Sequence, residues 1–158
     1  MALLTPDQSY PSVEQIPVDA LIAQGYRAVL IDIDNTLVPR DTGQIPAAVA
    51  NWVAQLKQSG LPCCLLSNNW HKTVFAHSAS LGIPVVYKAM KPAPFAYIRA
   101  LNKINASRNG AVIIGDQLLT DVLGARICGI QAILVESRST TDLWYTKIFR
   151  RIEKRFKK

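Results

Sequence analysis

Short aliphatic runs alternate along the chain with longer segments whose apolar residues recur at helical spacing. Such runs are typical of strands that are buried on both faces of a parallel sheet. They occupy 26–33, 61–67, 84–87, 111–115 and 131–135. The amphipathic segments occupy 46–57, 70–82, 92–104 and 118–128. Because strand and helix alternate, we expect an α/β domain built on a doubly wound, Rossmann-like, five-stranded parallel sheet.

The composition favours one globular domain. Of the 158 residues, 49% are hydrophobic and 18% are charged, which suits a packed core and excludes a disordered chain. No apolar stretch reaches the ~18–20 residues that cross a bilayer, and the first residues lack the pattern of a secretory signal. We therefore expect a cytoplasmic protein. Its predicted parts are a leader at 1–25, the α/β domain at 26–137 and a C-terminal segment at 138–158.

The positive charge is concentrated in that C-terminal segment. Of the net charge of +7, residues 142–158 carry +5, and the other 141 residues carry +2. On a helical wheel the aromatic and aliphatic side chains of this segment share one arc and the basic side chains the opposite arc. A basic amphipathic helix of this kind is typical of segments that lie in a bilayer interface. Two other interpretations stay open: its apolar face packs on the domain, or it binds nucleic acid, which the continuous apolar face disfavours.

Polar side chains follow three of the predicted strands. They are Asp32, Asp34, Asn35 and Thr36 after the first strand, Ser67, Asn68 and Asn69 after the second, and Asp116 and Asp121 after the fourth. Doubly wound sheets bind ligands at the carboxyl ends of their strands, so we expect these groups to converge. Several buried carboxylates repel one another unless a cation lies between them, and oxygen ligands suit a hard divalent ion such as Mg²⁺.

Lys91 and Ser67 add the groups that a phosphate needs. Lys91 precedes the helix predicted at 92–104, whose first backbone N–H groups also favour an anion. In such a site Asp32 would be the nucleophile that forms an aspartyl-phosphate. Asp34 would protonate the leaving oxygen and later deprotonate the attacking water. Taken singly, an aspartate is as often a helix cap or turn residue, and a lone Ser67 or Lys91 is more often a strand-end hydroxyl or a solvated lysine. Their order at successive strand ends is what favours a site.

The same residues resemble, in order, the four motifs of the haloacid dehalogenase (HAD) superfamily of phosphatases. The motifs are 32–36, Ser67, Lys91 and 115–121. Within the superfamily the chain is similar to the short, uncapped subfamily III A, which includes phosphatidylglycerophosphate phosphatases. The shared features are Pro-Ser-Val at 11–13, Asp-Asn-Thr-Leu at 34–37, Ser-Asn-Asn at 67–69, Lys-Pro at 91–92 and Gly-Asp-Gln-Leu-Leu-Thr-Asp at 115–121.

The resemblance implies a HAD-like fold and a role for each motif. Asp32 is the nucleophile, Asp34 is the general acid and base, and Ser67 and Lys91 hold the phosphoryl group. The implied Mg²⁺ ligands are Asp32, Asp34 through its backbone carbonyl, Asp116 and Asp121. The residues that we expect to contact the substrate are Asn35, Thr36, Arg40, Asn68 and Asn69, of which Asn35 and Thr36 also shape their loop. For Arg40 a solvated arginine is the more common interpretation.

The spacing of the motifs leaves no room for a cap domain. Only 32 residues separate Asp34 from Ser67 and 23 separate Ser67 from Lys91, and predicted helices and strands fill both intervals. An open site excludes water poorly, so its substrate should be large or held on a surface.

We therefore expect a Mg²⁺-dependent phosphatase, peripherally associated with the membrane, whose partners are an anionic phospholipid substrate and the membrane surface. The predicted reaction converts phosphatidylglycerophosphate to phosphatidylglycerol and phosphate. The alternative is a HAD phosphatase for a soluble phosphate monoester or a nucleic-acid end. A non-enzymatic adaptor is disfavoured, because a mere phosphate binder has no need of a proton donor at Asp34. The sequence sets no oligomeric state.

Overall fold

A single parallel sheet organises the chain. The computed structural model describes residues 2–138, 151 and 154. The strand order is β1-β6-β5-β2-β3-β4, and every pairing is parallel. The strands are β1 (Gln8–Tyr10), β2 (Ala28–Ile31), β3 (Cys63–Leu66), β4 (Val85–Val86), β5 (Ala111–Gly115) and β6 (Gln131–Val135). The α-helices are α1 (Val18–Ala23), α2 (Ala47–Gln58), α3 (Thr73–Leu81), α4 (Pro94–Lys103) and α5 (Leu123–Cys128). The doubly wound α/β prediction is confirmed.

The prediction of five strands is wrong, because the sheet has six. The additional strand, β1, comes from the leader segment and aligns Gln8 with Ile133 at the edge of the sheet. Its three residues are Gln, Ser and Tyr. A strand this short and polar has no aliphatic run to reveal it, and it forms because β6 offers an unpaired edge.

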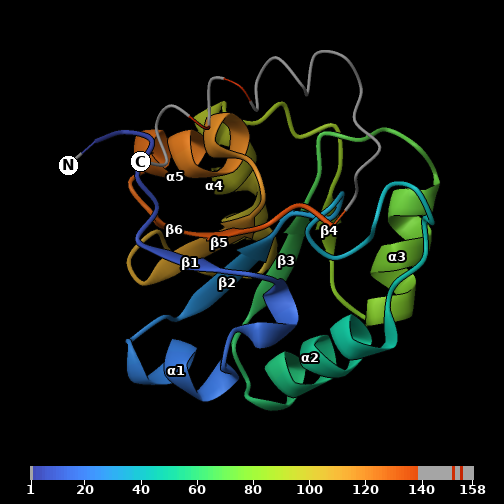
Figure 1. Ribbon diagram of the computed structural model, residues 1–158. Helices are drawn as coiled ribbons and strands as arrows, with labels where there is room; N and C mark the ends of the chain where they lie inside the picture. The colour runs from blue at the N-terminus through green and yellow to red at the C-terminus, as the bar shows by residue number, and fades with distance from the viewer. Residues whose placement is uncertain (1, 139–150, 152–153, 155–158) are drawn as a thin grey trace.

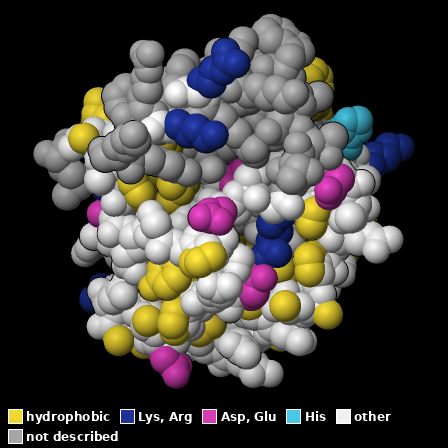
Figure 2. Space-filling model, viewed as in Figure 1, with side chains coloured by type: hydrophobic (Ala, Val, Ile, Leu, Met, Phe, Trp, Pro, Cys, Tyr) yellow, Lys and Arg dark blue, Asp and Glu magenta, His cyan; other side chains and the backbone are white. Residues whose placement is uncertain are grey.

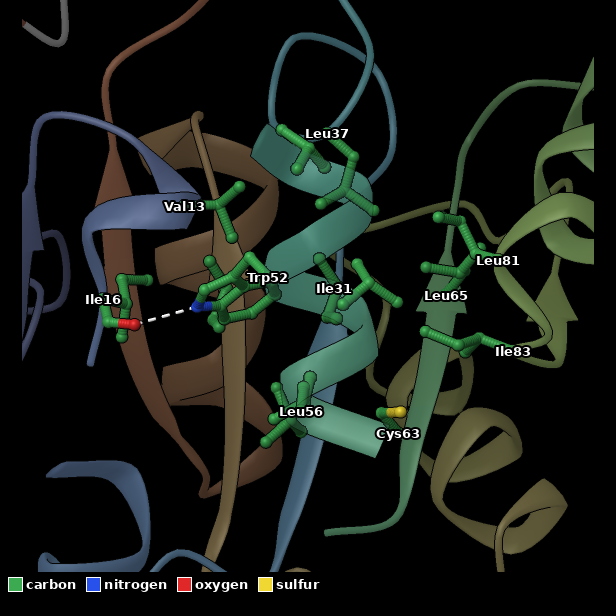
Figure 3. Packing of buried hydrophobic residues seen from close by; sticks show 14 of the residues in the cluster. Val13, Ile16, Ile31, Leu37, Trp52, Leu56, Cys63, Leu65, Leu81 and Ile83 are labelled. Atoms are coloured by element: carbon green, nitrogen blue, oxygen red, sulfur yellow. Dashed lines mark hydrogen bonds between the residues drawn. The ribbon is translucent and has the colours of Figure 1, made fainter. Parts of the chain in front are cut away.

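Helices cover both faces of the sheet (Figure 1). Successive side chains of a strand point to opposite faces, and the central strands supply apolar residues to both. In β2, Val29 and Ile31 pack with α1, α2 and α3, whereas Leu30 packs with α4 and α5. Figure 3 shows the first of these two core layers. The described surface in Figure 2, by contrast, shows hydrophobic side chains in small patches separated by polar atoms.

One buried hydrogen bond ties the leader to this core. The indole N–H of Trp52, on α2, donates to the backbone carbonyl of Ile16 at 2.8 Å (Figure 3). Trp52 and Ile16 are both buried, so the bond satisfies two polar groups that water does not reach. The leader is therefore packed against the domain rather than separate from its core.

Three helices begin later than their patterns predict. The backbone N–H of His71 donates to the side chain of Asn69 at 2.9 Å, and this local turn delays α3 to Thr73. The first turn of α4 contains Pro94 instead of Pro92. Leu118–Val122 form a π-helical turn, η2, before α5 begins at Leu123. Each delay leaves an irregular segment just after a strand, which is where the polar side chains gather.

The predicted amphipathic helix at 138–158 lies outside the described residues except for Arg138, Arg151 and Lys154. Arg151 and Lys154 are helical and exposed. Among the described residues, no helix is long and apolar enough to span a bilayer. The five buried strand ends of β2, β3, β4, β5 and β6 all face the same edge of the sheet, and there the candidate site lies.

Candidate active site

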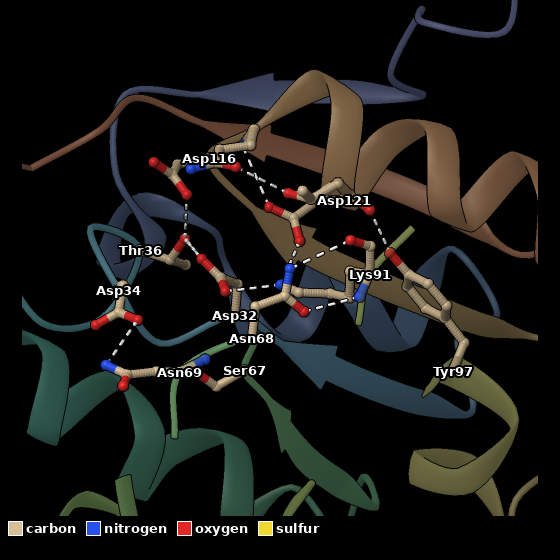
Figure 4. A network of polar contacts seen from close by, with 12 residues as sticks. Asp32, Asp34, Thr36, Ser67, Asn68, Asn69, Lys91, Tyr97, Asp116 and Asp121 are labelled. Atoms are coloured by element: carbon tan, nitrogen blue, oxygen red, sulfur yellow. Dashed lines mark hydrogen bonds and ion pairs between the residues drawn. The ribbon is translucent and has the colours of Figure 1, made fainter. Parts of the chain in front are cut away.

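Three buried carboxylates meet at the carboxyl ends of β2 and β5 (Figure 4). Asp32 follows β2, Asp116 follows β5 and Asp121 lies in the π-helical turn η2. One oxygen from each lies within 4.8 Å of the others. Lys91 completes the group: its Nζ lies 2.7 Å from Asp32 Oδ1 and 2.7 Å from Asp121 Oδ1. Residues from four segments of the chain therefore form one ionic cluster.

The cluster is short of positive charge. Burial, followed by the charges of Asp32 and Asp121, raises the pKa of Asp116 well above its usual range. Burial also raises the pKa of Asp121 to about 6, although the Lys91 ammonium opposes this. Burial alone would lower the pKa of Lys91, but Asp121 and Asp32 together raise it, so the lysine stays charged. One ammonium cannot balance three carboxylates, and these oxygens suit a divalent cation.

The loop after β2 holds the Asp32 carboxylate from within. The hydroxyl of Thr36 donates to Asp32 Oδ2 at 3.0 Å and lies 3.4 Å from Asp116 Oδ1. Asn35 adopts the left-handed conformation with φ 61°, which asparagine tolerates better than most residues. Its side-chain oxygen accepts a hydrogen bond from the backbone N–H of Arg40 at 3.0 Å. Asn35 and Thr36 are both buried, so their bonds shape the wall of the site.

Asp34 lies beside the cluster, outside the trio of close carboxylates. Burial, then the charge of Asp32, raises its pKa, while Arg40 and a hydrogen bond from Asn69 lower it. The Asn69 amide donates to Asp34 Oδ2 at 3.4 Å. A half-buried carboxyl with a raised pKa holds a proton closer to neutral pH than an exposed aspartate does, which suits a general acid.

The segment after β3 positions Lys91. The backbone N–H of Lys91 donates to Asn68 Oδ1 at 2.7 Å, and the Asn68 amide donates to the Lys91 carbonyl at 3.2 Å. Ser67 is buried, and its hydroxyl oxygen accepts the backbone N–H of Asn69 at 3.0 Å. The three residues at 67–69 thus link β3 to both Lys91 and Asp34.

Two connected hollows open from this edge. The inner one is lined by Asp32, Asp34, Arg40, Asn68, Lys91, Gln117 and Thr120. A wider one of about 480 Å³ shares Asp34, Arg40 and Asn68 and extends to His71 and His77 on the α3 side. Asp34, Arg40 and Asn68 line both hollows, so Asp34 lies where the two meet.

Three supporting residues carry no motif that sequence reasoning could use. The buried Tyr97 hydroxyl donates to the Thr120 carbonyl and so holds the turn that carries Asp121. Arg138 donates through its backbone N–H to the Asn35 carbonyl at 3.0 Å and through Nε to the Thr36 carbonyl at 2.9 Å. The guanidinium of Arg138 also pairs with Glu14.

The sequence does point to Gly115, through the Gly-Asp pair at the end of a predicted strand. A Cβ at this position would overlap the Asp121 side chain. The backbone N–H of Gln117 donates to Asp121 Oδ2 at 3.2 Å. Only glycine allows Asp121 to approach the end of β5 this closely.

Comparisons with known proteins place the geometry in a family. The family model described as HAD-hydrolase-like matches residues 89–152. A protein named "Probable phosphatase YqeG", from Bacillus subtilis (strain 168), is 35% identical over 150 residues, which cover 95% of this chain and 87% of the relative. The chain belongs to the HAD-like hydrolases. It is a phosphatase of that superfamily, and the described residues form no cap domain.

Solved structures of HAD-like proteins share the fold. NagD from E. coli K-12 superposes with a TM-score of 0.60 at 16% identity, covering 70% of this chain and 87% of that chain. A HAD phosphatase from Thermococcus onnurineus gives a TM-score of 0.61 at 16% identity, covering 75% of this chain and 89% of that chain. The fold prediction is therefore confirmed at the level of the superfamily.

Proposed function

We propose that this HAD-like phosphatase hydrolyses the terminal phosphate monoester of phosphatidylglycerophosphate, giving phosphatidylglycerol and phosphate. The observation that carries the proposal is the uncapped mouth of the site. Between Asp34 and Ser67 the chain forms α2 and β3, and between Ser67 and Lys91 it forms α3 and β4. With no cap in these intervals, a substrate held at a surface can present its headgroup directly.

The inner hollow supports attack by Asp32. A carboxylate oxygen of Asp32 forms a bond to phosphorus while the bond from phosphorus to the ester oxygen breaks. Asp34 gives its proton to that ester oxygen. Water then attacks the aspartyl-phosphate, Asp34 takes a proton from it, and phosphate leaves with the Asp32 carboxylate restored. Lys91 holds the Asp32 carboxylate in place before attack, because its ammonium lies 2.7 Å from Asp32 Oδ1.

The charge-deficient cluster supports a role for Mg²⁺. Asp32, Asp116 and Asp121 would hold the ion, and the family resemblance adds the backbone carbonyl of Asp34. A bound Mg²⁺ would supply positive charge to the phosphoryl oxygens. Thr36 keeps the Asp32 carboxylate oriented, and Asn69 keeps the Asp34 carboxylate beside it.

The decisive experiment measures phosphate release from phosphatidylglycerophosphate in mixed micelles with Mg²⁺, against a panel of soluble phosphates. We expect strong preference for the lipid. Asp32→Asn should abolish turnover of every substrate while the protein stays folded, and Asp19→Asn, an exposed carboxylate on α1, is the matched control that keeps activity. Release from soluble phosphates alone would overturn the lipid assignment and favour the soluble or nucleic-acid alternative. Full activity of Asp32→Asn would overturn the aspartyl-phosphate mechanism.

A further inference from the structure

Four large hydrophobic side chains are exposed together beside the mouth of the site. Trp70 is 75% exposed, Met90 67%, Phe75 46% and Tyr87 37%. We call these four residues the rim cluster. Isolated exposed hydrophobic residues are common on soluble proteins, but a contiguous group of this size marks a surface with a partner.

Lys88 links the two halves of the rim cluster, Phe75 with Tyr87 and Trp70 with Met90. The rings of Phe75 and Tyr87 meet edge to face at a centroid distance of 4.7 Å. Lys88 Nζ lies 5.7 Å from the centroid of the Tyr87 ring and 5.9 Å from that of Trp70. Trp70 and Met90 line one hollow of about 360 Å³ together with Lys88 and Asn68. The exposed Lys88 thus lies between the Tyr87 and Trp70 rings.

The rim cluster is coupled to the catalytic residues by the chain itself. Met90 directly precedes Lys91, and Trp70 directly follows Asn69, which bonds Asp34. Asn68 lines this hollow and also the inner hollow around Asp32. Whatever covers the rim cluster therefore lies next to the entrance for the substrate.

The charge around the rim cluster favours an anionic partner. No acidic residue lies between Asp41 and Asp116 in the sequence, the stretch that carries all four rim residues. Lys72 and Lys88 are exposed within this stretch, and Arg40 is exposed beside the wider hollow. No carboxylate is among the described residues that line the hollow of Trp70 and Met90. Exposed tryptophan with lysine is the combination that binds the interface of an anionic bilayer.

We propose that the rim cluster docks on an anionic phospholipid surface and turns the mouth of the site toward it. The apolar side chains enter the headgroup region, and Lys88 and Lys72 pair with lipid phosphates. A lipid headgroup then reaches Asp32 without leaving the bilayer. The inference rests on the proposed function in so far as that function needs a lipid substrate, but the docking surface is testable without any substrate.

The test uses the full chain and sedimentation with vesicles of phosphatidylcholine, with and without phosphatidylglycerol, neither of which is the substrate. The test variant is Trp70→Gln with Met90→Asn, the asparagine being chosen because Met90 has φ 62°. The control is Ile22→Gln with Ile127→Gln, since Ile22 and Ile127 are 47% and 52% exposed on α1 and α5. We expect the test variant to bind phosphatidylglycerol vesicles about tenfold more weakly than the control, which should bind like the unaltered protein.

Brominated lipids supply the second measurement, because they quench tryptophans that enter the bilayer. Quenching should occur in the unaltered protein and fall in Trp70→Phe. Equal vesicle binding by the test and control variants, with no difference in quenching, would overturn the inference and favour a protein partner for the rim cluster. If the unaltered protein does not hydrolyse phosphatidylglycerophosphate but its vesicle binding still depends on the rim cluster, the proposed function alone is overturned.

Discussion

Asp116 and Asp121 show how single residues are held in an unfavourable state. Both are buried, and burial raises the pKa of each. The charge of Asp32 raises both pKa values as well, and the charge of Asp121 raises that of Asp116. A carboxyl whose pKa is higher in the folded state than in the unfolded state binds its proton more tightly when folded. The metal-free protein therefore loses stability as these protons leave.

This gives a signed pH prediction for stability. Between about pH 4 and pH 7, the melting temperature of the metal-free protein should fall as pH rises, because Asp121 loses its proton near 6 in the folded state and near 3.8 when unfolded. Mg²⁺ should restore the loss, with a larger stabilisation at pH 8 than at pH 5. Thermal unfolding in EDTA and in Mg²⁺ measures both. An equal Mg²⁺ effect at the two pH values would contradict the prediction, and Asp116→Asn should reduce it.

For single residues, the sequence predicts the polar side chains that directly follow the ends of strands. Asp32, Asp116 and Asp121 converge because parallel strands end at one edge, and Lys91 joins them from the loop before α4. Their catalytic roles stay predictions. Tyr97 could not be predicted, because its partner is a backbone carbonyl that only the folded chain brings near.

At the scale of elements, the turn from β5 into η2 sets the distance between Asp116 and Asp121. The π-helical turn Leu118–Val122 places Asp121 back over the end of the strand, where Gly115 gives it room. Single π-helical turns of this kind recur at functional sites. The sequence predicts the helix at 118–128 but not this first turn, because the apolar spacing of the two helix types is nearly the same over five residues.

The substitution Gly115→Ala should push η2 away from the end of β5. The new Cβ would displace the Asp121 side chain, and we expect phosphatase activity to fall roughly a hundredfold because a shift of about 1 Å in a catalytic group has an effect of that order. Steady-state kinetics on a soluble phosphate ester measures it. Gly60→Ala is the control: its Cβ meets nothing within 4 Å but its φ is +81°, so it should lower stability and leave activity intact. Equal activity of the two variants would argue against the proposed constraint.

At the scale of the whole molecule, two parts of the chain offer basic side chains to an anionic surface. One is the rim cluster with the exposed Lys72 and Lys88, and the other is the C-terminal segment at 142–158, which carries +5. Stable membrane association generally needs two weak signals acting together. We therefore expect vesicle binding to weaken when either the rim cluster or the C-terminal segment is altered.

Deleting residues 142–158 should abolish measurable vesicle binding and leave hydrolysis of a soluble artificial phosphate unchanged. The reason is that this segment carries +5 of the net +7, while the carboxylates of the candidate site, Asp32, Asp116 and Asp121, all lie before it. Vesicle sedimentation and steady-state kinetics on the same preparation test both halves. If the truncated protein unfolds, the segment is instead a structural helix that packs on the domain.

The pairing of β1 with β6 has a consequence for how the chain is made. Gln8 aligns with Ile133 and Tyr10 with Val135, so β1 waits without a partner until β6 has been synthesised. During translation at ordinary rates this wait is on the order of ten seconds. A nascent chain that stops before β6 leaves β1 without its partner and the Arg138 link to Glu14 unmade. The two hydrogen bonds from Arg138 to the Asn35 and Thr36 carbonyls, which hold the loop after β2, likewise form only after residue 138 has been synthesised.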